Sequence, residues 1–187
     1  MNDGHMSFCA SDEWRTMVQE TILPVALRGV ELGDEAIEIG PGPGFTTDVL
    51  RTLTAHLTAV EVDEGLAASL AERIGEGDVD VVVGDATALD FPADRFTGAA
   101  SFHMLHHIAP SSEQDRAFAE LARVLVRGGV LVAADGTHSE GSARFHEGDT
   151  YNPIDPEELE SRLGTAGFGS IEVRTYDLGW VCTARAR

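Results

Sequence analysis

The feature that most constrains this chain is a glycine-rich turn that directly follows an apolar run. Gly40, Gly42 and Gly44 occupy alternate positions of the segment 38–44. Glycine lacks a Cβ atom, so it lets a strand turn sharply into a helix and lets a ligand approach the backbone closely. A second apolar run then leads to Glu61, 21 positions after Gly40. A carboxylate there can accept hydrogen bonds from both hydroxyls of a ribose, so the pair predicts a nucleoside-binding α/β site.

The same turn narrows the choice of ligand. A dinucleotide fingerprint would place its third glycine at position 45, where this chain has Phe45. A phosphate cradle also needs backbone N–H donors, which Pro41 and Pro43 lack. The turn therefore favours a ribosyl ligand without phosphates.

Short apolar runs alternate with helical patterns along the rest of the chain, which predicts a parallel sheet with helices on both faces. Strands are expected at residues 36–39, 57–62, 79–83, 98–102 and 130–134. Helices are expected at residues 46–54, 65–74, 113–125 and 156–166. The last two runs, 171–176 and 179–185, are too close together for a helical crossover, so they predict an antiparallel hairpin.

The length of 187 residues predicts a single domain, 1–187. Ser11 is expected to cap a first helix that Pro24 bends or ends. We expect residues 1–30 to form an N-terminal helical lid and residues 136–152, which lack periodicity, to form an irregular substrate loop.

The charge balance is strongly acidic. The chain has 13 arginines, no lysine and 32 acidic residues, for a net charge of -19. Because nucleic-acid binding requires cations that neutralise phosphates, DNA and RNA are not expected as partners. Only Cys9 and Cys182 are present, which fits a reducing cytoplasm, and no signal-peptide or membrane-spanning pattern is visible. We therefore expect a cytoplasmic monomer or homodimer with a small-molecule substrate and neither nucleic-acid nor membrane partners.

Five motifs occur in an order that resembles the class I S-adenosylmethionine-dependent methyltransferases. They are the glycine turn at 38–44, Val-Glu-Val-Asp at 60–63, Gly-Asp-Ala at 84–86, Ser-Phe-His-Met-Leu-His-His at 101–107 and Arg-Val-Leu-Val-Arg-Gly-Gly at 123–129. Arg127 replaces a proline that is usual in the last motif. The chain is most similar to the small-molecule branch of the family, methyltransferase type 11 or ubiquinone-biosynthesis-like. This resemblance implies a doubly wound, mostly parallel seven-stranded sheet with an antiparallel C-terminal hairpin.

The resemblance also implies the cofactor, S-adenosyl-L-methionine, and its product, S-adenosyl-L-homocysteine. It places Glu61 on the ribose hydroxyls, Asp85 with the Ala86 backbone at the adenine amino group, and Glu38 at the methionine amine. The full set of cofactor-binding residues that it implies is Glu38, Gly40, Pro41, Gly42, Gly44, Glu61, Val62, Asp85, Ala86, Ser101 and Phe102.

Histidines gather after the fourth predicted strand, where the methyl group should emerge. A histidine can remove the proton of a hydroxyl or phenol acceptor, so His103 and His106 are the candidate catalytic residues, although each can equally serve local structure. Trp14, His107 and Tyr151 are candidates for substrate contact, followed by His138 and His146. His103 and His107 are spaced to hold a metal on a helix, but no acidic partner pattern accompanies them, so no metal site is predicted.

Other functions fit parts of the pattern. The first two motifs also resemble the ribosomal RNA adenine dimethylases, but residues 101–104 lack the asparagine and proline of those enzymes. A protein that binds S-adenosylmethionine without catalysis, as a sensor or partner subunit, is the main alternative, and a nicotinamide dehydrogenase is a weaker one.

Overall fold

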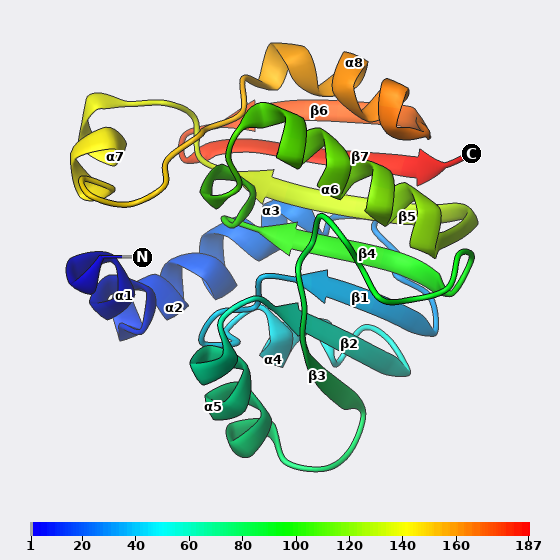
Figure 1. Ribbon diagram of the computed structural model, residues 1–187, viewed down its shortest axis with the longest axis horizontal. Coiled ribbons are helices and arrows are strands. Elements are labelled where there is room, and N and C mark those ends of the chain that lie inside the picture. Colours follow the sequence, from blue (N-terminus) through cyan, green and yellow to red (C-terminus); the bar gives the residue numbers. More distant parts are fainter. Residues whose placement is uncertain (1) are drawn as a thin grey trace.

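The computed structural model describes residues 2–187 and contains a seven-stranded sheet (Figure 1). The strand order is β3-β2-β1-β4-β5-β7-β6. The strands are β1 (Glu35–Ile39), β2 (His56–Glu61), β3 (Val79–Val83), β4 (Phe96–Phe102), β5 (Leu125–Asp135), β6 (Phe168–Tyr176) and β7 (Gly179–Ala186).

The first five strands are parallel and the last two reverse direction. β1 pairs in parallel with both β2 and β4, and β5 pairs antiparallel with β7. β6 and β7 form the expected hairpin. The predicted fold, a doubly wound sheet with an antiparallel C-terminal hairpin, is therefore confirmed. β5 begins at Leu125, five residues earlier than expected, because Leu125 already pairs with Phe96 of β4, across a register shift from the Gly98–Val130 pair.

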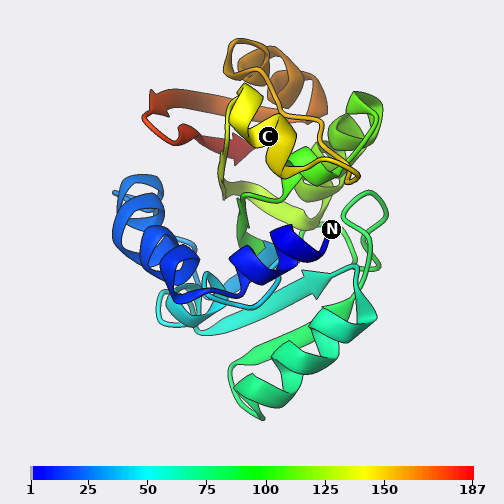
Figure 2. The same cartoon turned by 90° about the vertical axis from the view of Figure 1, so that its left-hand side faces the viewer.

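Helices cover both faces of this sheet (Figures 1 and 2). One buried core joins the sheet to α6 (Ser111–Val124) and α8 (Pro156–Ala166), and a second joins it to helices from the N-terminal third and to α5 (Glu64–Ile74). The remaining helices are α1 (Asp3–Cys9), α2 (Asp12–Met17), α3 (Leu23–Ala26), α4 (Thr47–Leu50) and α7 (Glu140–Phe145), with a π-helical turn η1 (Val18–Ile22) and a 3-10 turn η2 (Leu105–His107).

Capping residues explain where the long helices begin and end. Asp63 accepts the N–H groups of Gly65 and Leu66 at the start of α5, and an aspartate at this position satisfies donors that lack a partner in the helix. Asp155 does the same for α8, which ends at Gly167 in the left-handed conformation.

Of the two predicted effects of Pro24 on the N-terminal helix, a bend or an end, the structure contradicts the end. Ser11 caps α2 as expected, through its side chain and the N–H of Trp14. However, Pro24 neither ends nor starts the helical segment, which continues through η1 into α3. A widened π turn just before the proline accommodates the ring that would clash in a regular helix.

Two segments that were expected to be lid and loop lie together at one end of the sheet. Figure 1 shows α1, α2 and α7 at the end toward which the parallel strands point. The segment 136–152 is not entirely irregular, because it contains α7. Met1, part of the predicted lid 1–30, lies outside the described residues. None of the helices in residues 2–187 is long and apolar enough to cross a membrane.

Candidate active site

A pocket of about 520 Å³ opens at the carboxyl ends of the parallel strands. This is the end at which open α/β sheets bind ligands, and the volume suits a small organic molecule. The sequence-predicted residues that line it are Trp14, Gly40, Pro41, Gly42, Glu61, Val62, Asp85, Ala86, Phe102, His103 and His107.

The glycine turn brings the backbone to the wall of this pocket. Gly40 has a φ of +68° and its N–H donates to the carbonyl of Val60, 2.9 Å away. A Cβ atom added to Gly40 would lie 2.1 Å from Cγ of Met104. Only glycine fits this position without displacing the Met104 side chain, as the sequence pattern indicated.

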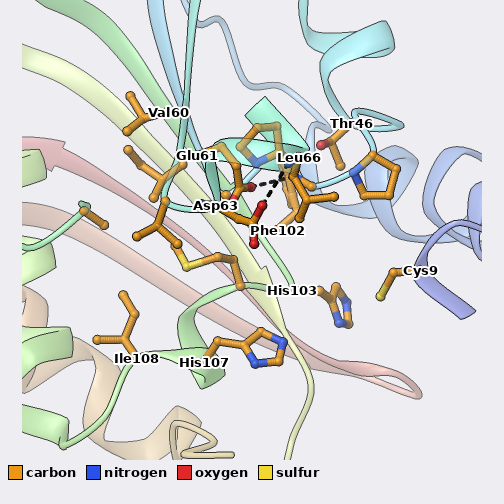
Figure 3. A pocket seen from close by; sticks show the side chains of 18 of the residues that line it. Cys9, Thr46, Val60, Glu61, Asp63, Leu66, Phe102, His103, His107 and Ile108 are labelled. Carbon is orange, nitrogen blue, oxygen red and sulfur yellow. Dashed lines mark hydrogen bonds between the residues drawn. The ribbon is translucent and has the colours of Figure 1, made fainter. Parts of the chain in front are cut away.

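Glu61 is almost fully buried at the end of β2 and faces the glycine turn (Figure 3). Its Oε2 accepts the N–H of Gly42 at 3.0 Å and its Oε1 accepts the N–H of Asp63 at 3.1 Å. Two carboxylate oxygens offer about four acceptor sites, so each can also receive a hydroxyl from a ligand. The two backbone donors hold the carboxylate in one orientation.

Asp85 lines the pocket from the turn after β3. Its Oδ1 accepts both the N–H and the Oγ1 hydroxyl of Thr87, each at 2.8 Å. Because Oδ1 accepts both of these hydrogen bonds, Oδ2 is the oxygen that can accept a hydrogen bond from a ligand.

Glu38, Gly44 and Ser101 do not line the pocket. The Glu38 carboxylate is 1% exposed and accepts the hydroxyls of Thr46 and Thr47. Burial raises the pKa of Glu38 from 4.5 to about 7, and the two threonine hydroxyls only partly offset this effect. Glu38 therefore holds the start of the following helix instead of reaching the cofactor space directly.

This buried carboxyl predicts a pH-dependent stability. When folding raises the pKa of a carboxyl group, that group contributes most to stability at pH values below its pKa in the unfolded chain. This contribution is lost as the pH rises through the pKa of the group in the folded protein. Glu38→Gln removes the titration. Between pH 5 and pH 8 the free energy of unfolding of the parent should therefore fall by about 2–3 kcal/mol relative to the variant.

Urea unfolding of both proteins at the two pH values measures this difference. The exposed Glu64 provides a control, Glu64→Gln, which should follow the parent. Parallel pH profiles for the parent and Glu38→Gln would show that Glu38 ionises at the same pH in the folded and unfolded chains.

His103 lies on the opposite side of the pocket from Glu61 (Figure 3). It has a φ of +51°, and its Nε2 is buried without a hydrogen-bond partner among the described residues. Its Nδ1 is 4.0 Å from Oδ1 of Asp135, and the Trp14 ring packs edge-on against it. Burial lowers the pKa of His103, although the Asp135 charge opposes this effect, so the ring is neutral near pH 7.

His106, the other predicted catalytic residue, is buried behind the pocket wall and does not line it. Its Nδ1 lies 2.6 Å from Oδ1 of Asp135 and its backbone N–H donates to Oδ2 at 3.0 Å. Tyr151 also lies away from the lining and stacks on His146, with ring centroids 4.4 Å apart. His107 does line the pocket, and burial lowers its pKa to about 3.

Sequence reasoning missed several residues of this site. Asp135 is fully buried at the end of β5, and the only signal was a polar residue ending a buried strand. His5 and Cys9 line the pocket from α1, and although residues 1–30 were expected to form a lid, no motif singled out these two side chains.

A pocket with these residues at the carboxyl ends of a seven-stranded sheet with a reversed last strand defines a class I methyltransferase. The profile of a family described as "Methyltransferase domain" matches residues 37–133, just over half of the chain. The chain belongs to this family, whose cofactor is S-adenosylmethionine.

Similar proteins with known names differ in their substrates. A demethylmenaquinone methyltransferase of Clavibacter sepedonicus is 27% identical, over 92% of this chain and 78% of that protein. A probable ribosomal RNA small subunit methyltransferase A of Methanothermobacter thermautotrophicus is 48% identical over 59 residues, 32% of this chain and 22% of that protein. The chain thus spans about a fifth of the length of that relative.

Solved structures share the fold at low sequence identity. An S-adenosylmethionine-dependent methyltransferase from Mesorhizobium loti has a TM-score of 0.74 at 16% identity, over 90% of this chain and 99% of that chain. A chain from the complex between the Haloferax volcanii Trm112 methyltransferase activator and a putative methyltransferase has a TM-score of 0.77 at 17% identity, over 100% and 99% of the two chains.

These comparisons correct one prediction. The sequence-based expectation excluded nucleic-acid partners and allowed only a monomer or homodimer, and this exclusion is wrong. Several relatives are named as ribosomal RNA methyltransferases, and one structural neighbour comes from a complex with an activator protein. The net charge of -19 sums over the whole chain and does not describe a local contact surface, so it could not exclude such partners.

Proposed function

We propose that this methyltransferase transfers the methyl group of S-adenosylmethionine to the oxygen of a small hydroxyl or phenol compound held beside His103. The observation that carries the proposal is that two segments cover one side of the pocket and are joined to each other by hydrogen bonds and ring packing. We call this side, where the methyl acceptor is proposed to bind, the acceptor side. We call residues 2–10 together with residues 139–150 the pocket cover. A covered pocket of about 520 Å³ suits a small molecule better than a base that remains part of a polymer.

Direct contacts hold the pocket cover together. The side-chain amide of Asn2 donates to the carbonyls of Phe145 and Glu147, at 3.0 and 3.2 Å. The ring of Phe145 also packs against Phe8 and His5, with centroids 5.4 and 4.8 Å apart. These contacts join α1 to the end of α7, and a cover of this kind limits the access of water to the space beneath it, which favours group transfer.

The proposed cofactor contacts follow from the same pocket. Glu61 receives the ribose hydroxyls, Asp85 and the Ala86 backbone lie at the adenine, and the turn at 40–42 contacts the ribose and methionine portions. In this arrangement the sulfonium methyl points toward His103, across the pocket from Glu61 (Figure 3), and toward Trp14, whose ring packs against His103.

The chemistry asks mainly for alignment. The acceptor oxygen attacks the methyl carbon in line with the C–S bond, so that a C–O bond forms as the C–S bond breaks and S-adenosylhomocysteine leaves. Positioning of this kind can contribute about 7–11 kcal/mol. The acceptor proton passes to Nε2 of His103, which is neutral and unpartnered, while Asp135 favours the proton on Nδ1.

A methyl-transfer assay tests the proposal. Labelled S-adenosylmethionine is offered with panels of phenols, alcohols, amines and thiols, and in parallel with small-subunit ribosomal RNA. We expect transfer to members of the phenol or alcohol panel. Transfer to the RNA alone would assign the protein to the substrate class of its ribosomal relatives instead. The expected cytoplasmic location and the alternative of a non-catalytic sensor remain predictions from the sequence.

The role of His103 predicts a kinetic effect. His103→Gln should lower kcat for a hydroxyl acceptor by about 10²-fold, the low end for a general base because the sulfonium already activates the methyl group. Donor affinity should not change. Steady-state kinetics and donor calorimetry measure the two quantities. The matched control is His138→Gln, because His138 was a sequence-based candidate for substrate contact but is exposed and outside the pocket lining. An unchanged kcat would remove His103 from the mechanism.

A further inference from the structure

Four histidines from three separate segments meet at the acceptor side of the pocket. They are His5 of α1, His106 and His107 of η2, and His146 directly after α7. One ring nitrogen of each lies within 4.8 Å of those of the others. Three of the four residues are less than 9% exposed. Three buried imidazoles and a half-buried fourth in one place are unusual, because histidine is not a typical core residue.

In each ring, the Nδ1 atom faces an oxygen acceptor. Two of these acceptors are carboxylates and two are backbone carbonyls: Asp149 at 3.1 Å from His5, Asp135 at 2.6 Å from His106, Thr150 O at 3.2 Å from His107 and Ser142 O at 2.7 Å from His146. A carbonyl or an ionised carboxylate only accepts, so each Nδ1 carries the ring proton. The four Nε2 atoms are then without a proton and present lone pairs.

This tautomer assignment creates a conflict that a cation would resolve. The Nε2 atoms of His106 and His146 are 3.1 Å apart, close enough for a hydrogen bond. With both ring protons on Nδ1, however, neither Nε2 can donate, and two lone pairs face each other in a buried space. For two neutral rings such an arrangement is repulsive unless a positive charge lies between the two nitrogens, either a bound cation or a proton that the two nitrogens share.

We propose that His5, His106, His107 and His146 bind one divalent transition-metal ion such as Zn²⁺ through their Nε2 atoms. Imidazole nitrogen is a preferred ligand of these ions. Tetrahedral Zn²⁺ with Zn–N distances of about 2.0–2.1 Å places its ligands about 3.3 Å apart, close to the 3.1 Å between His106 and His146. Ring nitrogens of the four residues lie within 4.8 Å of one another, so rings farther apart than the tetrahedral spacing move inward when the ion binds.

The oxygen acceptors behind the four rings provide independent support. Histidines that bind metals almost always donate their second ring N–H to a carboxylate or a backbone carbonyl, which fixes the tautomer and orients the ring. All four rings here have such a partner. This proposal departs from the sequence-based expectation of no metal, which considered only His103 and His107. The structure leaves His103 out of the cluster, because its backbone leaves the helical region at φ +51°.

The ion would link the pocket cover to the strand ends. His5 and His146 belong to the two halves of the cover, whereas His106 and His107 follow β4, so one ion would tie all three segments together. His5 and His107 also line the pocket, which places the ion at the wall of the acceptor space. Only this last statement rests on the proposed function.

Metal titration tests the proposal without a methyl acceptor. The full chain is freed of metal with a chelator, exchanged into chelator-free buffer and titrated with Zn²⁺ in a calorimeter. We expect one ion per chain with a submicromolar Kd, and a rise in Tm when Zn²⁺ is present. His146→Ala should weaken binding by at least 100-fold and should abolish the rise in Tm. His138→Ala, in the same segment but outside the cluster, should bind like the parent.

A second variant guards against misfolding of the first. His5→Gln lies in the first helix of the chain, and far-ultraviolet circular dichroism checks that both variants keep the parent fold. Zn²⁺ binding with a Kd above about 100 μM, or equal affinity of the parent and both folded variants, would overturn the proposal and leave a hydrogen-bonded imidazole cluster. Because calorimetry with S-adenosylhomocysteine measures the cofactor site separately, failure of the metal site and failure of the proposed function are distinguishable.

Discussion

Glu61→Ala should lose at least 100-fold in affinity for S-adenosylmethionine and S-adenosylhomocysteine. A hydrogen bond to a charged group contributes about 1.5–3 kcal/mol, and the ribose offers two hydroxyls to this carboxylate. The loss of both contacts therefore costs about 3–6 kcal/mol in donor binding. The substitution also removes the acceptor for the N–H groups of Gly42 and Asp63, which hold the glycine turn against the end of β2.

Calorimetry with S-adenosylhomocysteine measures this effect directly. Glu64→Ala removes an exposed carboxylate only three residues away and outside the pocket lining, so it controls for the loss of one negative charge near a cationic ligand. Equal donor affinity of Glu61→Ala and the parent would contradict the whole assignment of the donor site.

Asp135→Ala should destabilise the fold by about 3–5 kcal/mol. The side chain is fully buried, and its two oxygens accept the Nδ1 and N–H of His106 and the N–H of Gly136. Removing one partner of a buried, hydrogen-bonded polar group leaves the others without compensation, which costs this much in typical proteins. In a chain of this size, the loss corresponds to a fall in Tm of about 10 °C.

Urea and thermal unfolding measure the change. Asp135→Asn should fall between the parent and the alanine variant, because an amide keeps one acceptor oxygen but turns an N–H group toward a donor. Asp34→Ala, an exposed aspartate, should leave the stability within about 0.5 kcal/mol of the parent. A similarly small effect of Asp135→Ala would mean that the contacts of this carboxylate at the end of β5 do not stabilise the fold.

The fold could be predicted because its signals are local. Apolar runs of strand length alternate with helical periodicity, and each expected strand appears within a few residues of its predicted bounds, except for the early start of β5. Residues 126–129 lie in the irregularity between the Phe96–Leu125 and Gly98–Val130 pairs, and no apolar pattern there indicated that β5 already begins at Leu125. The register shift that accommodates them depends on the neighbouring strand, so the sequence of β5 alone could not reveal it.

The position of three proposed donor-site residues was also predictable. Gly40 and Asp85 follow parallel strands and Glu61 ends one, and the carboxyl ends of such strands necessarily meet at one edge of the sheet. Glu38 shows the limit of this reasoning. It has the expected place in the sequence, but alternation along β1 and the two threonines of the next turn bury its carboxylate behind the pocket wall.

The acceptor side depends on contacts between residues far apart in the chain. His5 and His146 are separated by 141 positions, yet their ring centroids lie 4.5 Å apart. Neither carries a spacing or motif that relates it to the other.

The sequence by itself determined the α/β fold, the glycine turn and the strand-end carboxylates, because periodicity and spacing along the chain specify where strands end. Only the tertiary structure decided which histidine reaches the pocket, which carboxylates orient the rings and what covers the acceptor. These features arise where α1 and α7 pack over the same strand ends, and no short segment of the chain contains the interactions that bring them together.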